Sequence, residues 1–246
     1  MPGGGPQGSS VGLLEYDAQS NDNTTFIPED DKYKWVDDLS VLEIINLVTV
    51  GLCSYNFKQH VASDIGVGQL YIPPENIKSQ EYLDNIEEWT ERNKMKLNEN
   101  KTKVIIFNFS KNYQFSTRLH LNNTVLEIVR ETSVLGTIVR SDLSWYSNTR
   151  YLVKRGYARL TILRNLYQFS IPEEDLVQIY CLYIRSVLEY ISSVWFSSIT
   201  QEENNDLERV QKCAVKIILK EEYIDYPTAL VRLNIQSLSE KRKVLS

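Results

Sequence analysis

A change in hydrophobic periodicity near Trp145 is the feature that most limits how this chain can fold. Before it, short runs of β-branched and aromatic residues alternate with turn signals, which predicts short strands and hairpins. After it, apolar residues recur at spacings of three and four, as they do along one face of a helix. The sequence therefore predicts an α+β fold with two domains, residues 1–140 and residues 141–246.

The first domain is predicted to contain hairpins and one amphipathic helix. The strand-like runs "KYKWV" and "LSVLEII" flank Asp37 and Asp38, so these two acids are expected at or near a hairpin tip. Residues 79–97 fit a helix, and "KVIIFNF" after it predicts a strand. Asn122 and Asn123 separate two alternating segments, which is a hairpin signal. "TSVLGTIV" is predicted as a further strand with a glycine in its middle.

The second domain is predicted to be almost entirely helical. Two capping-box patterns, Ser170-x-x-Glu173 and Thr200-x-x-Glu203, each precede an apolar-periodic run. We expect helices near residues 147–168, 172–196 and 202–220, with a shorter one from about Pro227.

Composition excludes several classes of protein. The 246 residues are 42% hydrophobic and 24% charged, which is ordinary for a globular chain. No apolar run reaches the roughly 18 residues of a membrane span, and "MPGGGPQGSS" lacks the features of a signal peptide. We therefore expect an intracellular protein of the nucleus or cytoplasm, neither secreted nor membrane-bound. The three cysteines, Cys53, Cys181 and Cys213, have no paired spacing that would indicate a zinc site or a disulfide.

The charge is distributed unevenly between the two predicted domains. The net charge is −5, with 13 basic and 19 acidic residues up to position 140 and 14 and 13 after it. Local patches of charge therefore say more about partners than the total does.

The adjacent carboxylates of Asp37 and Asp38 need an explanation. Two neighbouring anions repel each other, and Asp is a poor strand former. The pair is therefore either a solvated hairpin turn or a site that binds cations, and these two residues alone leave both interpretations open.

Several stretches, taken in order, resemble one family. "GGGPQGSSVG" at residues 3–12 resembles the Gly-x-Pro-Gln-Gly motif of reverse transcriptases, and "WVDD" at residues 35–38 resembles their aromatic-x-Asp-Asp motif. "EEWTERNKMKLNENKTKVIIF", "SVLGTIVRSDLSW" and "LVQIYCLYIRSVLEYISSVWFSSI" resemble the region that follows the active site in polymerases of non-LTR, LINE-type (jockey-like) retrotransposons. The resemblance spans nearly the whole chain. It implies an incomplete polymerase palm, an antiparallel sheet with packed helices, followed by an all-helical thumb-like region.

The resemblance implies a nucleotidyltransferase that adds deoxynucleoside triphosphates (dNTPs) to a DNA primer on an RNA template by a two-metal mechanism. Asp37 and Asp38 would bind Mg²⁺ or Mn²⁺, with Asp37 the more direct ligand. Lys101 resembles a family lysine that acts near the leaving pyrophosphate, and Lys103 is the competing choice. For either lysine, an ordinary solvated side chain is the other interpretation.

Further residues are implied to contact nucleotide or primer. The nucleotide-binding set is Pro6, Gln7, Gly8 and Trp35. A glycine-rich segment lets backbone approach a ligand closely, although a terminal loop without any role has the same composition. Leu135 and Gly136 resemble the primer-grip hairpin, where a missing side chain admits the sugar-phosphate strand. An ordinary bulge glycine is the alternative.

The stretch after Trp145 carries no acidic residue between Asp142 and Glu173. Its cations are Arg150, Lys154, Arg155, Arg159 and Arg164. On a helix, Arg150, Lys154 and Arg164 fall within an arc of about 80°, beside an apolar face. We expect Arg150, Lys154, Arg155 and Arg164 to bind nucleic-acid backbone, with a merely solvated basic edge as the alternative.

The chain departs from the family in two ways. Trp35 stands where the family usually has Tyr or Phe, and Met1 lies within the glycine-rich motif, downstream of the family's first catalytic Asp and its fingers. We therefore expect a fragment of an RNA-directed DNA polymerase with little or no activity alone, which would need an upstream palm-fingers segment as partner. The alternatives are a non-catalytic, nucleic-acid-binding remnant of a retrotransposon and an unstable relic.

Overall fold

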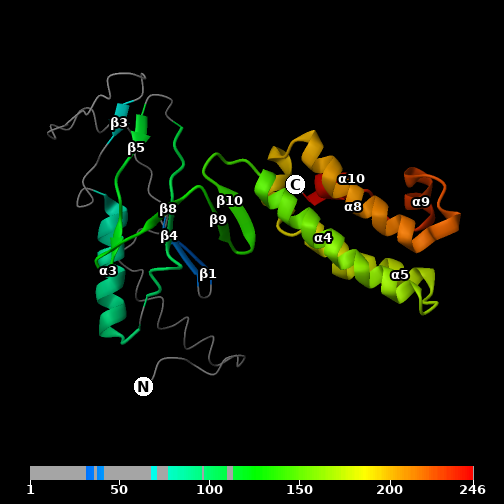
Figure 1. Cartoon of the computed structure of the whole chain (residues 1–246), viewed down its shortest axis with the longest axis horizontal. Coiled ribbons are helices and arrows are strands. Elements are labelled where there is room, and N and C mark those ends of the chain that lie inside the picture. Colours follow the sequence, from blue (N-terminus) through cyan, green and yellow to red (C-terminus); the bar gives the residue numbers. More distant parts are fainter. Residues whose placement is uncertain are drawn as a thin grey trace. The chain divides into compact units, whose positions relative to one another are not determined.

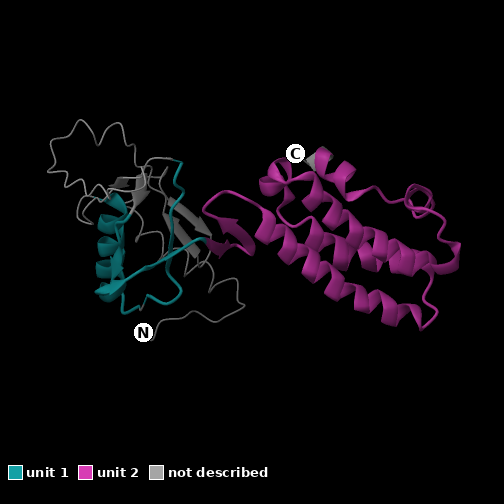
Figure 2. Ribbon diagram, turned by 45° about the horizontal axis from the view of Figure 1, so that its top comes forward, with its two compact units in different colours: residues 1–130 teal, residues 131–246 magenta. Residues whose placement is uncertain are grey.

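The computed structural model describes residues 32–35, 38–41, 68–70, 77–95, 97–109 and 113–245. These residues form helices and short strands, in agreement with an α+β chain. The chain divides into two compact units, Met1–Arg130 (unit 1) and Glu131–Ser246 (unit 2), which are coloured separately in Figure 2. Each unit is described by itself.

Unit 1 contains short paired strands, several of which are labelled in Figure 1. β1 (Lys32–Trp35) pairs antiparallel with β2 (Asp38–Val41), so the hairpin predicted around the acidic pair is confirmed. Two further strand pairs are parallel: β3 (Gly68–Leu70) with β5 (Tyr113–Phe115), and β4 (Lys103–Ile105) with β8 (Glu127–Val129). The strand predicted for "KVIIFNF" therefore ends early, at Ile105.

The helix of unit 1, α3 (Lys78–Arg92), forms where residues 79–97 predicted one, but it is shorter. Its apolar face buries Tyr82, Ile86 and Trp89, which recur at spacings of four and three. The Gln80 amide joins this helix to the strand region that follows. Its Nε2 donates to the His120 carbonyl at 3.1 Å, and its Oε1 accepts from the His120 backbone N–H at 2.8 Å.

The hairpin predicted at the two asparagines is confirmed. β6 (His120–Leu121) pairs with β7 (Thr124–Val125), and the turn residues Asn122 and Asn123 have φ of 47° and 60°. Two consecutive positive φ angles match the twist of paired strands, and Asn tolerates them better than most residues.

A further hairpin opens unit 2. β9 (Glu131–Val134) pairs with β10 (Thr137–Arg140) through a two-residue turn, Leu135 and Gly136, whose φ angles are 49° and 79°. The prediction of one strand with an internal glycine was therefore wrong, because this glycine makes the turn.

This hairpin packs on the first helix of unit 2. Asn148 Oδ1 accepts a hydrogen bond from the Ile138 backbone N–H at 3.2 Å, and Arg140 Nη1 donates to Ser147 Oγ at 3.2 Å. The hairpin thus belongs to the same compact unit as the helices, and the boundary between the two units falls after Arg130.

The rest of unit 2 is helical. Its α-helices are α4 (Tyr146–Tyr167), α5 (Glu173–Ile179), α6 (Ser186–Leu188), α7 (Ser192–Trp195), α8 (Gln201–Leu219), α9 (Tyr226–Arg232) and α10 (Leu238–Leu245). A π-helix, η4 (Tyr180–Arg185), joins α5 to α6, and two short 3₁₀-helices are η5 (Phe196–Ser198) and η6 (Lys220–Glu222). α4 and α8 run side by side (Figure 1).

Gly156 sets how closely α4 approaches its neighbours. A Cβ at this position would lie 2.8 Å from Leu188 Cδ2 and 2.9 Å from Val210 Cγ1. The buried cluster around it includes residues from Leu152 on α4 to Leu238, the first residue of α10. None of the helices in the described part of the chain combines the length and the apolar character that a membrane-spanning helix needs.

The two capping-box predictions have opposite outcomes. At the start of α8 the box forms: the Glu203 N–H donates to Thr200 Oγ1 at 3.2 Å, and the Thr200 N–H donates to Glu203 Oε2 at 2.6 Å. At α5 the prediction was wrong, because Pro172 is the N-cap and has an extended ψ of 146°. A proline disfavours helical backbone in the residue before it, here Ile171. Ile171 would be the first helical residue if Ser170 were the cap, so the helix begins after Pro172 instead.

The helix predicted over residues 172–196 is interrupted. After α6 the chain turns through Ile191, which has a φ of 48°, before α7 begins. α10 was not predicted, whereas α9 begins at Tyr226 with Pro227 in its first turn, as expected.

Candidate nucleic-acid site

The second residue of the acidic pair, Asp38, lies where the β1–β2 hairpin closes. Asp38 is the first residue of β2 and pairs with Trp35, the last residue of β1. The pairing leaves only residues 36 and 37 between the strands. Asp37 itself lies outside the described residues, as do Pro6, Gln7 and Gly8.

Carboxylate oxygens are the ligands that Mg²⁺ and Mn²⁺ prefer, so the acidic pair fits such an ion in kind. The pair would provide two carboxylate groups as ligands. Within the described ranges, no group of three or more His, Cys, Asp and Glu side chains could hold a metal ion.

The two candidate lysines differ in their contacts. Lys103 begins β4, and its Nζ lies 2.5 Å from Oε2 of Glu127, the residue opposite it on β8. Lys101 is exposed in the preceding turn, where its backbone N–H donates to the Asn98 carbonyl at 3.1 Å. Its ammonium forms no ion pair with any residue that the structure describes. The contacts thus favour Lys101 over Lys103 as a lysine available to a phosphate.

The turn of the β9–β10 hairpin is held by Tyr190. The Tyr190 hydroxyl donates to the Leu135 carbonyl at 2.9 Å, and a Cβ at Gly136 would lie 3.5 Å from the Tyr190 ring. The turn is thereby fixed to the helical part of unit 2. Tyr190 was not among the predicted site residues, because this contact spans 55 positions of sequence.

All four predicted backbone-binding cations of α4, namely Arg150, Lys154, Arg155 and Arg164, are exposed. Their helix buries Leu152, Leu160 and Leu163 on the opposite side. No acidic residue occurs on α4, and none of its cations forms an ion pair within the described residues. Arg155 lies on the other edge of the exposed face from Arg164, so the four cations form a broad surface rather than a single line.

Four of the five arginines of unit 2 outside α4 have carboxylate partners within the described residues, and the exception is the buried Arg242. Examples are Arg140 with Asp142 at 2.9 Å and Arg185 with Glu189 at 2.9 Å. The hydrogen bond from Arg140 lowers the pKa of the Asp142 carboxyl to about 2. The cations of α4 differ from these four arginines in having no carboxylate partner within the described residues.

Exposed tyrosines accompany the α4 cations and were missed at the sequence level. The Arg150 guanidinium lies 6.0 Å from the Tyr146 ring centroid, and that of Arg155 lies 5.4 Å from the Tyr151 ring. Both pairs have the four-residue spacing that joins neighbours on a helix, so the spacing could have revealed them. Aromatic rings interleaved with cations are typical of surfaces that bind nucleic acid.

A second set of cations, on α8 and at its C-cap, was also missed. Lys212, Lys216 and Lys220 follow one another at intervals of four residues. Their ammonium groups lie 5.0, 5.1 and 3.3 Å from the ring centroids of Tyr226, Tyr223 and Tyr167, respectively. The lysine spacing is visible in the sequence, whereas the three tyrosines come from other elements.

Comparisons with protein-family models, with curated proteins and with solved structures each found no match to this chain. The functional assignment consequently depends on the sequence motifs and on the geometry described above.

Proposed function

We propose that this chain is part of an RNA-directed DNA polymerase of the non-LTR retrotransposon type. Such an enzyme joins a deoxynucleotide to the 3′-hydroxyl of a DNA primer on an RNA template. In this proposal the hairpin of unit 1 carries the metal-binding carboxylates, and the basic surface of α4 in unit 2 contacts the strands.

The observation that supports the proposal most is the pairing of β1 with β2. It brings the aromatic and the second acid of "WVDD" opposite each other and leaves two residues for the turn. Adjacent carboxylates at such a position repel each other, and a bound divalent cation would offset that repulsion. The same "WVDD" follows a "GGGPQGSSVG" motif in the family's order.

Each proposed residue has a distinct task. Asp37 and Asp38 would hold Mg²⁺ or Mn²⁺, which supplies charge neutralisation for the triphosphate when bound. Lys101 would place its ammonium, which has no ion-pair partner among the described residues, near the leaving pyrophosphate. Trp35 and the segment of Pro6, Gln7 and Gly8 would contact the incoming nucleotide.

Primer extension with Mg²⁺ tests this proposal. The chain is assayed on an RNA template with a DNA primer, alone and joined to an upstream palm-fingers segment from a related polymerase. We expect the joined chain to extend primers and Asp37→Asn to abolish extension. Asp84→Asn, in α3 of the same unit, is the control, because the asparagine keeps the Oδ1 atom that accepts from Gln80 at 2.7 Å. Equal extension by Asp37→Asn and by the unaltered joined chain would overturn the assignment of the site.

A second candidate function is nucleic-acid binding without catalysis. The observation that favours it is the exposed surface of α4, whose cations have no carboxylate partners among the described residues. When log affinity is plotted against log salt concentration, the slope is negative, and each phosphate contact adds about 0.9 to its magnitude. We expect the double variant Arg150→Gln, Lys154→Gln to reduce the magnitude of that slope by about two.

The matched control for this titration removes two exposed cations from unit 1, as Arg92→Gln with Lys94→Gln. It changes net charge equally and should leave the slope nearly unchanged. Absence of binding to a primer-template at low salt would exclude this second function.

A further inference from the structure

Two rows of cations lie on neighbouring helices of unit 2. The α4 row is Arg150, Lys154 and Arg164, and the α8 row, which ends at the C-cap, is Lys212, Lys216 and Lys220. All six side chains are exposed, and none of them forms an ion pair with a residue that the structure describes. At about 100° per residue, each row covers an arc of about 80° on its helix.

Acidic side chains are sparse along both rows. α4 has none, and α8 has none after Glu208. Of the acids that follow α8, Glu222 pairs with Arg232 and Asp225 caps α9, which leaves Glu221 beside the row. The two rows therefore keep most of their positive charge, in a chain whose net charge is −5.

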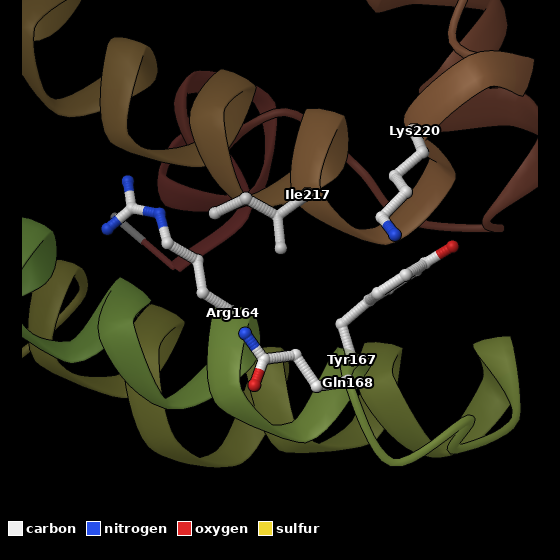
Figure 3. Close-up of a pocket in the computed structure, with 5 residues that line it drawn as sticks. All are labelled: Arg164, Tyr167, Gln168, Ile217 and Lys220. Atoms are coloured by element: carbon white, nitrogen blue, oxygen red, sulfur yellow. The ribbon is translucent and has the colours of Figure 1, made fainter.

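α4 and α8 run in the same direction, so the two rows lie along one junction. Gly156 of α4 lies beside Val210 of α8, and about two turns later Arg164 lines a pocket of about 300 Å³ together with Ile217 and Lys220. Figure 3 shows Arg164 and Lys220 on opposite sides of Ile217. The two rows therefore suit a ligand that carries charges along its length rather than a single anion.

Tyrosine rings already hold the α8 row in place. The three ammonium groups lie 5.0, 5.1 and 3.3 Å from ring centroids. An ammonium held over a ring loses less conformational freedom when it meets a phosphate. The row is about 12 Å long, and one strand of a duplex has a phosphate about every 3.4 Å of its axis, so the row matches about three or four phosphates.

Tyr157 lies at the junction between the rows. Its hydroxyl and the Cys213 thiol form a hydrogen bond, which ties the ring to α8. The side chain is still 39% exposed. A partly exposed ring beside phosphate-binding cations can stack a base, provided that the face of the base is not covered by its neighbours in a duplex. Tyr157 therefore favours a single strand over a duplex.

We infer that a single-stranded nucleic acid binds along this junction, with its phosphates on the two rows and one base stacked on Tyr157. The inference rests on the proposed nucleic-acid binding of α4, and it adds the α8 row, Tyr157 and the choice of a single strand. An anionic membrane fits less well, because helices that lie on membranes insert Trp, Phe or Leu side chains. The arcs of the two rows contain none of these residues.

The first test titrates the full chain with a fluorescent thymidine oligonucleotide of about 12 nucleotides, a length within the range of single-strand sites. Lys212→Gln with Lys216→Gln should reduce the magnitude of the salt slope by about 1.4, because each phosphate contact of a single strand contributes about 0.7. Arg92→Gln with Lys94→Gln removes the same charge from unit 1 and should leave the slope unchanged. An unchanged slope in the α8 variant would overturn the inference.

Tyr157→Leu separates stacking from electrostatics. The variant should bind the oligonucleotide about tenfold more weakly and a duplex of the same sequence as well as the unaltered chain does. Tyr157→Phe keeps the ring without the bond to Cys213 and should retain the affinity. Tyr183→Leu, on η4 and 43% exposed, is the control. Equal losses for single strand and duplex, or an equal loss in Tyr157→Phe, would indicate a structural role and overturn the inference.

The same titrations show which proposal fails. A slope that responds to Arg150→Gln with Lys154→Gln but not to the α8 variant would leave nucleic-acid binding by α4 in place and exclude the two-row ligand. Binding to neither single strand nor duplex would exclude both. Vesicles of phosphatidylserine are the remaining probe. Vesicle binding that Tyr157→Leu weakens as much as it weakens oligonucleotide binding would indicate a membrane partner and overturn the inference.

Discussion

Unit 1 and unit 2 keep their structure by different means. The described part of unit 1 buries one face of α3 together with Leu121 and Leu126, and its strands are two to four residues long. Unit 2 surrounds one continuous apolar cluster with helices from α4 to α10. Short strand pairs depend on their neighbours, whereas long amphipathic helices bury a core of their own. The proposed catalytic motifs thus belong to unit 1, whose described core is the smaller, and the basic surface belongs to unit 2.

Among the substitutions that test this comparison, Trp195→Ala in unit 2 should cause the largest loss of stability. Trp195 is fully buried, and its Nε1–H donates to the Tyr190 carbonyl at 3.0 Å. Truncating it should reduce the free energy of unfolding by about 3–5 kcal/mol. Denaturant unfolding followed by circular dichroism measures this, with Phe169→Ala, 76% exposed, as the control. Similar losses in the two variants would contradict the position assigned to the core.

Ile86→Ala in α3 is the corresponding change in unit 1. Ile86 is 5% exposed on the buried face of the helix. Its truncation should cost about 2–3 kcal/mol and lower the stability of unit 1 alone. Hydrogen exchange resolved by residue should show faster exchange in α3 with no change in α8. Equal acceleration in both helices would show that the two units unfold as one.

Gly156→Ala tests the close packing of α4, because the substitution would stabilise an open helix but should destabilise a tightly packed one. On an open helix surface this substitution stabilises by about 1 kcal/mol, because alanine is the better helix former. Here the added Cβ meets Leu188 and Val210 at less than 3 Å, so we expect a loss of about 1–3 kcal/mol. A gain in melting temperature would mean that α4 can move away from its neighbours.

The smallest expected effect is on the pH dependence of the melting temperature, through Asp142. The hydrogen bond from Arg140 lowers the folded-state pKa of Asp142 from 3.8 to about 2. A lowered pKa gives stability that is present above the ordinary value and is lost as the pH falls through the folded one. Asp142→Asn should therefore reduce the fall in melting temperature between about pH 5 and pH 2. An unchanged pH profile would show that this pair does not persist in solution.

Local signals account for what the sequence predicted correctly. The Asn122–Asn123 turn, the capping box at Thr200 and the boundaries of α4 depend on residues a few positions apart. The error at Ser170 is also local, since Pro172 prevents the cap from forming, and the proline could have been weighed against the capping pattern.

Long-range packing accounts for what the sequence could not predict. The fully buried Gln211 accepts from the Tyr180 hydroxyl at 2.5 Å and donates to Tyr226 at 2.9 Å, and neither partner is on its own helix. The pocket likewise depends on the register between α4 and α8, which no periodicity within either helix specifies. Of the candidate site, the sequence located the basic helix and the hairpin, but neither Tyr190 nor the tyrosines beneath the α8 lysines.

Divalent-cation binding at the hairpin tests the central claim most directly. Mn²⁺, a paramagnetic substitute for Mg²⁺, is added to the full chain with a deoxynucleoside triphosphate, and broadening of the backbone amide signals of β1 and β2 is measured. We expect broadening at the ends of the two strands next to the turn, with Asp37→Asn and Asp38→Asn each reducing it strongly and Asp84→Asn leaving it unchanged. Broadening that persists in both hairpin variants, or that is absent from the unaltered chain, would contradict the account.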